Sequence, residues 1–171
     1  MSFRRAVLGC ALGVVFVAAP TLSAASHQVA SVTGGGSFLY AGTIPMQFGF
    51  SAVVHADGSA SGAFHHAYAA DGFTYEFWGS VTCMTFDEAA GRAWIGGILT
   101  KVVTNDPDVT QQPGDDAWFR VLDAGTAGDR STAMGFVGAF PSSAAYCAMQ
   151  PWPDDNARTH PVTAGQIVLK S

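Results

Sequence analysis

Apolar side chains alternate with polar or small ones along most of this chain, and that period of two limits the fold more than any other feature. From Met46 to Val54 the apolar residues recur at every second position, which is typical of a strand with one face toward a core. The same pattern predicts further strands at Val29–Tyr40, Ser61–Tyr68, Phe73–Phe86, Ala93–Val103, Ala117–Leu122, Thr132–Phe140 and Val162–Leu169. The chain is therefore expected to be all-β.

Turn sequences separate the predicted strands. Asp57-Gly58 and Asp71-Gly72 are pairs that favour tight turns, and the stretch from Asp123 to Asp129 contains two glycines. Only Ser23–Gln28 and Ser142–Met149 suit even one turn of helix. Short strands joined by tight turns predict a single antiparallel domain of about eight strands, either a β-sandwich or a small closed β-barrel.

The turns also predict strand register. If Ala56-Asp57-Gly58 is a three-residue loop with a left-handed glycine, Phe50 faces Phe64 and Phe48 faces His66. A two-residue turn at Asp71-Gly72 then brings Tyr68 opposite Tyr75 and His66 opposite Phe77. A two-residue turn at both places would put His65 on the Phe48 side instead. The first arrangement is favoured because it buries more aromatic area.

The N-terminus has the pattern of a secretory signal peptide. Arg4 and Arg5 precede an apolar run that ends at Pro20, and small residues follow up to Ala25. The run is shorter than the roughly 20 apolar residues of a membrane-spanning helix. We therefore predict a signal peptide over residues 1–25, a single β domain over residues 26–171, and a secreted protein, extracellular or periplasmic. The paired arginines leave the general and the twin-arginine export routes both open.

The cysteines point to the same compartment. Loss of the signal peptide removes Cys10 and leaves Cys83 and Cys147. Two cysteines in an exported chain predict a disulfide, with two separately buried thiols as the alternative.

Charge excludes several classes of partner. The net charge of the whole chain is −5, and removal of the two leader arginines makes the remainder more acidic. With no basic stripe or basic amphipathic helix, neither nucleic acid nor an anionic membrane surface is an expected partner, and no integral membrane segment is expected after processing.

Several glycine-rich motifs together resemble a known family. They are Gly34-Gly35-Gly36, Phe48-x-Phe50, Ala93-x-Ile95-x-Gly97, Asp123-x-Gly125-x-x-Gly128-Asp129 and Gly165-x-Ile167-x-Leu169. The chain resembles, over residues 30–169, an uncharacterised small secreted bacterial β-domain that follows choice-of-anchor regions in longer proteins. The resemblance implies an all-β extracellular module of unknown activity, without a set of catalytic residues. The chain departs from that family at Ala124, where the family has asparagine, and in its two cysteines and Pro151-Trp152-Pro153.

Two groups of polar residues are candidates for ligand chemistry. Asp123 and Asp129 can bring two carboxylates together with glycine carbonyls between them, as a calcium site requires, although the spacing is not that of an EF-hand. Their other interpretation is as turn-capping residues. His65 and His66 point to opposite faces of one strand, so they cannot act together on one ligand.

Aromatic residues supply the remaining candidates. Trp118 and Trp152 are possible surface binding residues for a carbohydrate or a protein, or else plugs at the end of the fold. No catalytic residue is predicted. The expected function is a non-enzymatic, secreted binding or envelope-associated module of unknown ligand. The alternative is a small β-barrel enzyme or carrier of a small apolar ligand, with a pocket lined by Phe48, Phe50, His66 and Tyr75.

Overall fold

The fold is one antiparallel sheet that closes on itself. The computed structural model describes residues 28–136, 138–154, 156 and 158–171. Its strands are β1 (Gln28–Tyr40), β2 (Ile44–His55), β3 (Ala60–Ala70), β4 (Phe73–Asp87), β5 (Arg92–Thr104), β6 (Asp116–Leu122), β7 (Arg130–Thr132), β8 (Gly135–Phe136) and β9 (Thr159–Lys170). The predicted signal peptide lies outside the described residues.

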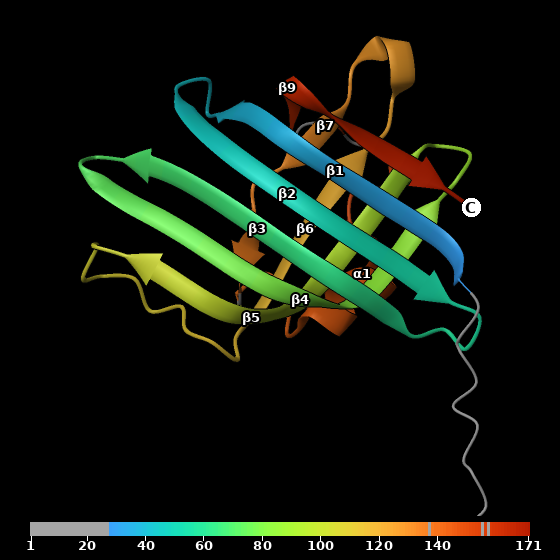
Figure 1. Cartoon of the computed structure of the whole chain (residues 1–171), viewed down its shortest axis with the longest axis horizontal. Coiled ribbons are helices and arrows are strands. Elements are labelled where there is room, and N and C mark those ends of the chain that lie inside the picture. Colours follow the sequence, from blue (N-terminus) through green and yellow to red (C-terminus); the bar gives the residue numbers. More distant parts are fainter. Residues whose placement is uncertain (1–27, 137, 155, 157) are drawn as a thin grey trace, which may run out of the picture.

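The ring closes because β5 pairs with both β4 and β6. The strand order is β5-β4-β3-β2-β1-β9-β7-β6-β8, and the extra β5–β6 pairing leaves eight strands in a closed ring with β8 attached to β6. The prediction of an all-β, antiparallel fold is confirmed, and of the two architectures left open the closed barrel is the one formed. Figure 1 shows the long strands β1 to β4 crossing in front of β6.

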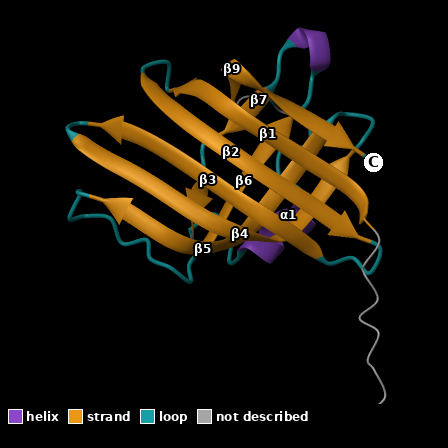
Figure 2. Cartoon of the chain, in the orientation of Figure 1, coloured by secondary structure: helices purple, strands orange, loops and turns teal. Residues whose placement is uncertain are grey.

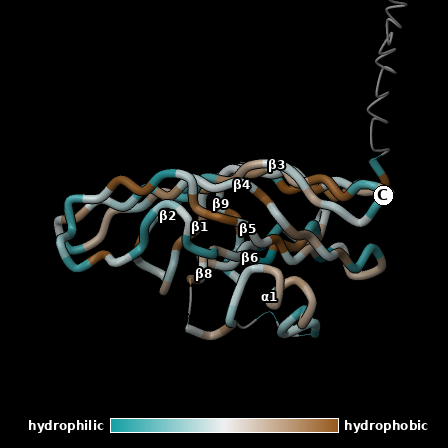
Figure 3. Tube along the Cα trace, turned by 90° about the horizontal axis from the view of Figure 1, so that it is seen from below, coloured by the Kyte–Doolittle hydropathy of each residue, from teal (hydrophilic) through white to brown (hydrophobic). Residues whose placement is uncertain are grey.

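Helical structure is slight and lies outside the ring. It consists of α1 (Ser143–Met149) and the short 3₁₀ helix η1 (Gly125–Ala127) (Figure 2). Seen from below (Figure 3), the ring is flattened, and α1 packs on the outer side of the layer that contains β6. Within the described part of the chain, no helix has the length and apolar character needed to cross a bilayer.

The predicted register of the first hairpins is confirmed. Phe48 pairs with His66, and His66 pairs in turn with Phe77 on the next strand. Gly58 is left-handed at φ 81°, as a three-residue loop with a bulge requires. Asp71 and Gly72 both have positive φ, which is the conformation of a two-residue hairpin turn whose twist matches that of its strands.

Aromatic side chains fill most of the interior. Phe48, Phe50, Phe64 and Phe77 are all buried and point inward from β2, β3 and β4. They meet Phe119 from β6 on the opposite wall, with ring centroids 5.3 Å from Phe50 and 5.7 Å from Phe64. Burial of this apolar area, at about 25 cal/mol per Å², is the main term that holds the ring closed.

A glycine permits the close approach of β4 and β5. A Cβ atom on Gly97 would lie 2.0 Å from the carbonyl oxygen of Ser80 and 2.9 Å from the Phe64 ring. The β4–β5 ladder carries register shifts in this region, between Trp78 and Gly79 and between Val81 and Cys83. Such irregularities bend a sheet and raise its twist, as closure into a ring requires.

One predicted strand is wrong. The segment Thr132–Phe140 was expected to be continuous, but the chain forms only the short strands β7 and β8 there. At the break the Thr132 hydroxyl accepts a hydrogen bond from the backbone N–H of Arg120, so a side chain takes the place of a backbone carbonyl. This competition between side-chain and backbone acceptors is not visible in the alternation of apolar residues.

A disulfide fixes α1 to the barrel. Cys83 on β4 and Cys147 on α1 are bonded, as predicted, across a sequence separation of 64 residues. The Ser142 side chain caps the helix by accepting a hydrogen bond from the N–H of Ala145. The Thr85 hydroxyl donates to the Cys147 carbonyl at 3.0 Å, so α1 is held on β4 by both kinds of bond.

We predict that replacing both Cys83 and Cys147 with serine lowers the stability of the protein. The disulfide closes a long loop and so restricts the unfolded chain. On the chain-entropy model, its removal lowers the free energy of unfolding by about 4 kcal/mol. Thermal melts of the oxidised protein and of the double variant measure the difference. Equal melting temperatures, or free thiols at both positions in the exported protein, would contradict the prediction.

Candidate functional site

A cavity of about 290 Å³ opens inside the ring at the end where the β1–β2 and β3–β4 turns lie; we call it the inner cavity. Most of its wall is apolar, and one imidazole and two phenols add polar groups. The residues that line it are Tyr40, Ile44, Met46, His66, Tyr68, Phe77, Ala133, Met134 and Phe136. Ligand sites are typically concave, largely apolar and supplied with a few polar groups of this kind.

His66 is the buried polar group of the inner cavity. Its side chain is 0% exposed, and Nδ1 and Nε2 have no hydrogen-bond partner among the described residues. Its neighbours are the rings of Phe48 and Phe119, with centroids 6.1 Å and 5.0 Å away. Burial in these surroundings, with a smaller contribution from His65, lowers the pKa of His66 to about 3. The imidazole is therefore neutral near pH 7, with one nitrogen as donor and the other as acceptor.

Strand alternation puts His66 there and sends its neighbour outward. His65 lies on the outer surface of β3, stacked on Trp78 at 4.6 Å, with Nε2 4.0 Å from a carboxylate oxygen of Glu76. The expectation that the two histidines face opposite sides is confirmed. No pair of histidines is available to one ligand at this position.

Of the four residues expected to line one pocket together, His66 alone lines the inner cavity. Phe48 and Phe50 belong to the packed core beside the cavity. Tyr75 lies outside it, and its hydroxyl donates a 2.6 Å hydrogen bond to Asp106 Oδ2. That bond, more than any other cause, raises the pKa of Tyr75 to about 12.

Tyr68, and not Tyr75, lines the inner cavity. The two rings stack at 4.5 Å, with Tyr68 on the side of the cavity. Burial raises the pKa of Tyr68, with Tyr40 and Asp106 adding to the shift. The phenol therefore stays protonated and can donate a hydrogen bond.

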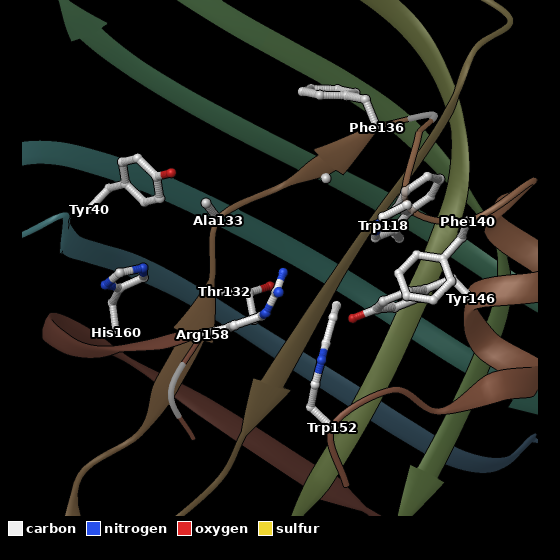
Figure 4. A pocket seen from close by; sticks show the side chains of 12 residues that line it. Tyr40, Trp118, Thr132, Ala133, Phe136, Phe140, Tyr146, Trp152, Arg158 and His160 are labelled. Atoms are coloured by element: carbon white, nitrogen blue, oxygen red, sulfur yellow. The ribbon is translucent and has the colours of Figure 1, made fainter. Parts of the chain in front are cut away.

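A second cavity, of about 380 Å³, lies outside the wall formed by β6; we call it the outer cavity (Figure 4). Aromatic side chains dominate its lining, and Arg158 adds one positive charge. The residues that line it are Tyr40, Trp118, Thr132, Ala133, Gly135, Phe136, Ala139, Phe140, Tyr146, Trp152, Arg158 and His160. Because Tyr40, Ala133 and Phe136 line both cavities, the segment that joins β7 to β8 forms part of the partition between them.

Trp118 is not the surface residue that was expected. It is 4% exposed, stacked on Tyr146 at 5.7 Å and meeting Phe140 edge-on at 5.6 Å. Alternation along β6 explains this, because Ala117 and Phe119 point into the core and Trp118 points outward under α1. Trp152 is partly exposed and forms an edge of the outer cavity.

Asp123 and Asp129, the two candidates for a calcium site, accept hydrogen bonds from backbone N–H groups. Asp129 accepts hydrogen bonds from the N–H groups of Ala124 and Ile167, at 3.1 Å and 2.6 Å. Asp123 accepts from those of Gly125 and Leu169, at 3.3 Å and 3.0 Å. Both carboxylates thus fasten the η1 loop to β9, in line with their interpretation as turn-capping residues. Across the residues that the structure describes, no group of three acidic, histidine or cysteine side chains is gathered as for a metal ion.

Sequence reasoning missed Met134, Arg158 and His160. Met134 reaches the inner cavity only because the expected strand over Thr132–Phe140 is interrupted. Arg158 lies at the end of the loop between α1 and β9 and His160 at the start of β9, and no local pattern in the sequence shows that this loop returns to β6. His160 stacks on Phe38 at 5.3 Å, and its pKa is lowered by burial and by the nearby Arg130.

No protein-family model matches the chain, and comparisons with curated proteins and with solved structures find no match either. The resemblance to the secreted β-domain family therefore stays a prediction.

We predict that His66→Phe removes a pH-dependent loss of stability. Because the pKa of His66 is about 3 in the folded protein and near 6.5 when unfolded, the unfolded chain binds the extra proton between these values. The stability is complete above the unfolded pKa and falls by up to about 1.4 kcal/mol per pH unit toward pH 3. Urea unfolding of both proteins from pH 7 to about pH 4.5 measures the slope.

His65→Ala is the matched control, because it removes the neighbouring exposed histidine. It should keep the wild-type slope and be close to neutral at pH 7, whereas His66→Phe should be as stable as wild type or more so. A wild-type slope in His66→Phe would mean that the imidazole is not held neutral by burial.

Proposed function

We propose that this protein binds a small, largely apolar molecule that carries one hydrogen-bonding group, in the inner cavity. The observation that carries the proposal is His66, which lines the cavity, is fully buried and has two ring nitrogens without a partner among the described residues. Buried polar groups in folded proteins are nearly always hydrogen-bonded, and leaving one unsatisfied costs about 1–3 kcal/mol. A ligand hydroxyl or carbonyl satisfies that requirement once the side chains that enclose the imidazole move to admit it.

The lining defines the rest of the ligand. Met46, Phe77 and Phe136 offer apolar contact, and a methionine side chain adapts its shape to the molecule it meets. A cavity of about 150 Å³ holds benzene, so 290 Å³ suits one or two fused rings or a short branched chain. A neutral imidazole in apolar surroundings disfavours a charged group at this point.

We further propose that the protein works outside the cytoplasm. The disulfide is typical of proteins that reach an oxidising compartment. The basic and apolar N-terminal segment supports the same location. Together they support a secreted protein, and a ligand in the inner cavity favours the carrier of a small apolar ligand that was the alternative to a binding or envelope-associated module.

We predict that 2-naphthol binds the wild-type protein and that His66→Leu weakens this binding by about tenfold, the value of one net hydrogen bond. Leucine keeps a similar volume and removes both ring nitrogens. Methyl NMR of the methionines locates the ligand, because Met46 and Met134 line the inner cavity while Met149 is 63% exposed elsewhere. Only the first two signals should shift.

Naphthalene and His65→Leu are the controls. Naphthalene has no polar group, so wild type and His66→Leu should bind it equally, and His65→Leu should bind 2-naphthol as wild type does. Equal affinity of 2-naphthol for wild type and His66→Leu would contradict the role of the imidazole. Unshifted Met46 and Met134 signals with both compounds would contradict the cavity as a binding site.

A further inference from the structure

The outer cavity has a cation, Arg158, that no carboxylate among the described residues neutralises. Arg158 is exposed at its edge, with the guanidinium carbon 4.3 Å from the centre of the Trp152 ring. Among the described residues it has no acidic partner, and none of those that line the cavity is acidic. The cation is therefore held at a cavity edge with donors available to an anion.

The ring under that cation is fixed in position. The guanidinium of Arg120, itself 1% exposed, donates hydrogen bonds to the backbone carbonyls of Pro151 and Trp152. The indole N–H of Trp94 donates to the same Pro151 carbonyl at 2.9 Å. Phe140 meets Trp152 edge-on at 5.8 Å. The Trp152 platform is thus set by the barrel wall before any ligand arrives.

A neutral donor lies on the opposite side of the space. Figure 4 shows the Tyr146 hydroxyl directed toward the Trp152 ring, with Arg158 on the other side of that ring. Burial raises the pKa of Tyr146 well above its ordinary value, and the positive charge of Arg120 offsets only part of this. The hydroxyl is therefore protonated and adds a neutral donor to the lining of the outer cavity.

From these contacts we infer that the outer cavity binds a small aromatic carboxylate. Its ring packs against Phe140 and Trp118, and its carboxylate accepts hydrogen bonds from Arg158 where that side chain lies on Trp152. A planar guanidinium matches a carboxylate in a two-point hydrogen bond, and it does so while stacked on an aromatic ring. Stacking of a sugar on Trp152 is disfavoured, because Arg158 already lies over that ring.

This site goes beyond the proposed function and is chemically distinct from it. The inner cavity presents a neutral imidazole among apolar walls, and the outer cavity presents a permanent positive charge at an aromatic edge. The two ligand classes therefore differ in charge, and a variant of one site leaves the polar group of the other intact.

The test compares 2-naphthoate with its neutral analogue 2-naphthamide by calorimetry. We expect the wild-type protein to bind the carboxylate about tenfold more tightly, as a charge-assisted hydrogen bond provides. Arg158→Gln should bind both compounds with the affinity that wild type has for the amide. Arg158→Lys should keep part of the preference, since it retains the charge but not the planar fork.

Lys101→Gln is the matched control, because Lys101 also lies over a tryptophan, Trp78, with its Nζ 4.4 Å from the ring centre. It should keep the full preference for the carboxylate. The inference is overturned if Arg158→Gln keeps the preference, if Lys101→Gln loses it, or if neither compound binds wild type at millimolar concentration.

Methyl NMR separates this result from the proposed function. If 2-naphthoate binding is lost in His66→Leu and shifts the signals of Met46 and Met134, the carboxylate occupies the inner cavity. The outer site is then overturned while the proposed function stands. If 2-naphthoate binds His66→Leu as it binds wild type, the outer site is supported whatever the outcome with 2-naphthol.

Discussion

The whole structure depends on β5 pairing on both edges. Its hydrogen bonds to β4 and to β6 turn an open sheet into a ring, so that the inward faces of all the strands share one interior. The pairing is possible because Gly97 lets the backbone of β4 come within a distance that any side chain would prevent. The contacts between facing walls of the ring follow from that closure, among them the meeting of Phe119 with Phe50 on β2 and Phe64 on β3.

The closed ring is packed along most of its interior and has a cavity at one end. Along most of the ring, aromatic rings from facing walls fill the space. Near the β1–β2 and β3–β4 turns the facing wall is the interrupted segment between β7 and β8, and there the inner cavity opens. His66 lies where the packed core meets this cavity, so its imidazole is desolvated by the core while it borders the cavity. The same interruption contributes Ala133 and Phe136 to both cavities.

Local signals in the sequence were enough for all but one of the predicted strands and for the register that buries His66. Gly58 and Gly72 have the positive φ that the two turns require. The length of each turn sets the strand register, and the register decides which residues face inward. The disulfide followed from the count of cysteines. The break at Thr132 was not predictable, because it depends on a side-chain hydroxyl that accepts a hydrogen bond from the backbone of the neighbouring strand β6.

The binding sites were predictable only in part for the same reason. His66 was found because its face depends on nearby turns, whereas Phe48 and Phe50 were assigned to a pocket although the opposite wall packs against them. That wall comes from β6, and no local pattern specifies which residues of β2 it covers. Trp118 was assigned to the surface because the return of α1 and its loop over β6 is likewise a long-range event.

The central claim is that His66 is a buried, neutral imidazole that contacts the ligand of the inner cavity. Nitrogen-15 NMR of histidine-labelled protein tests it most directly, because the two ring nitrogens report both protonation and hydrogen bonding. We expect His66 to show one protonated and one unprotonated nitrogen from pH 7 down to about pH 5, and both signals to shift when 2-naphthol is added. A His66 that titrates near its ordinary pKa of 6.5, with nitrogen signals unmoved by the ligand, would contradict the account.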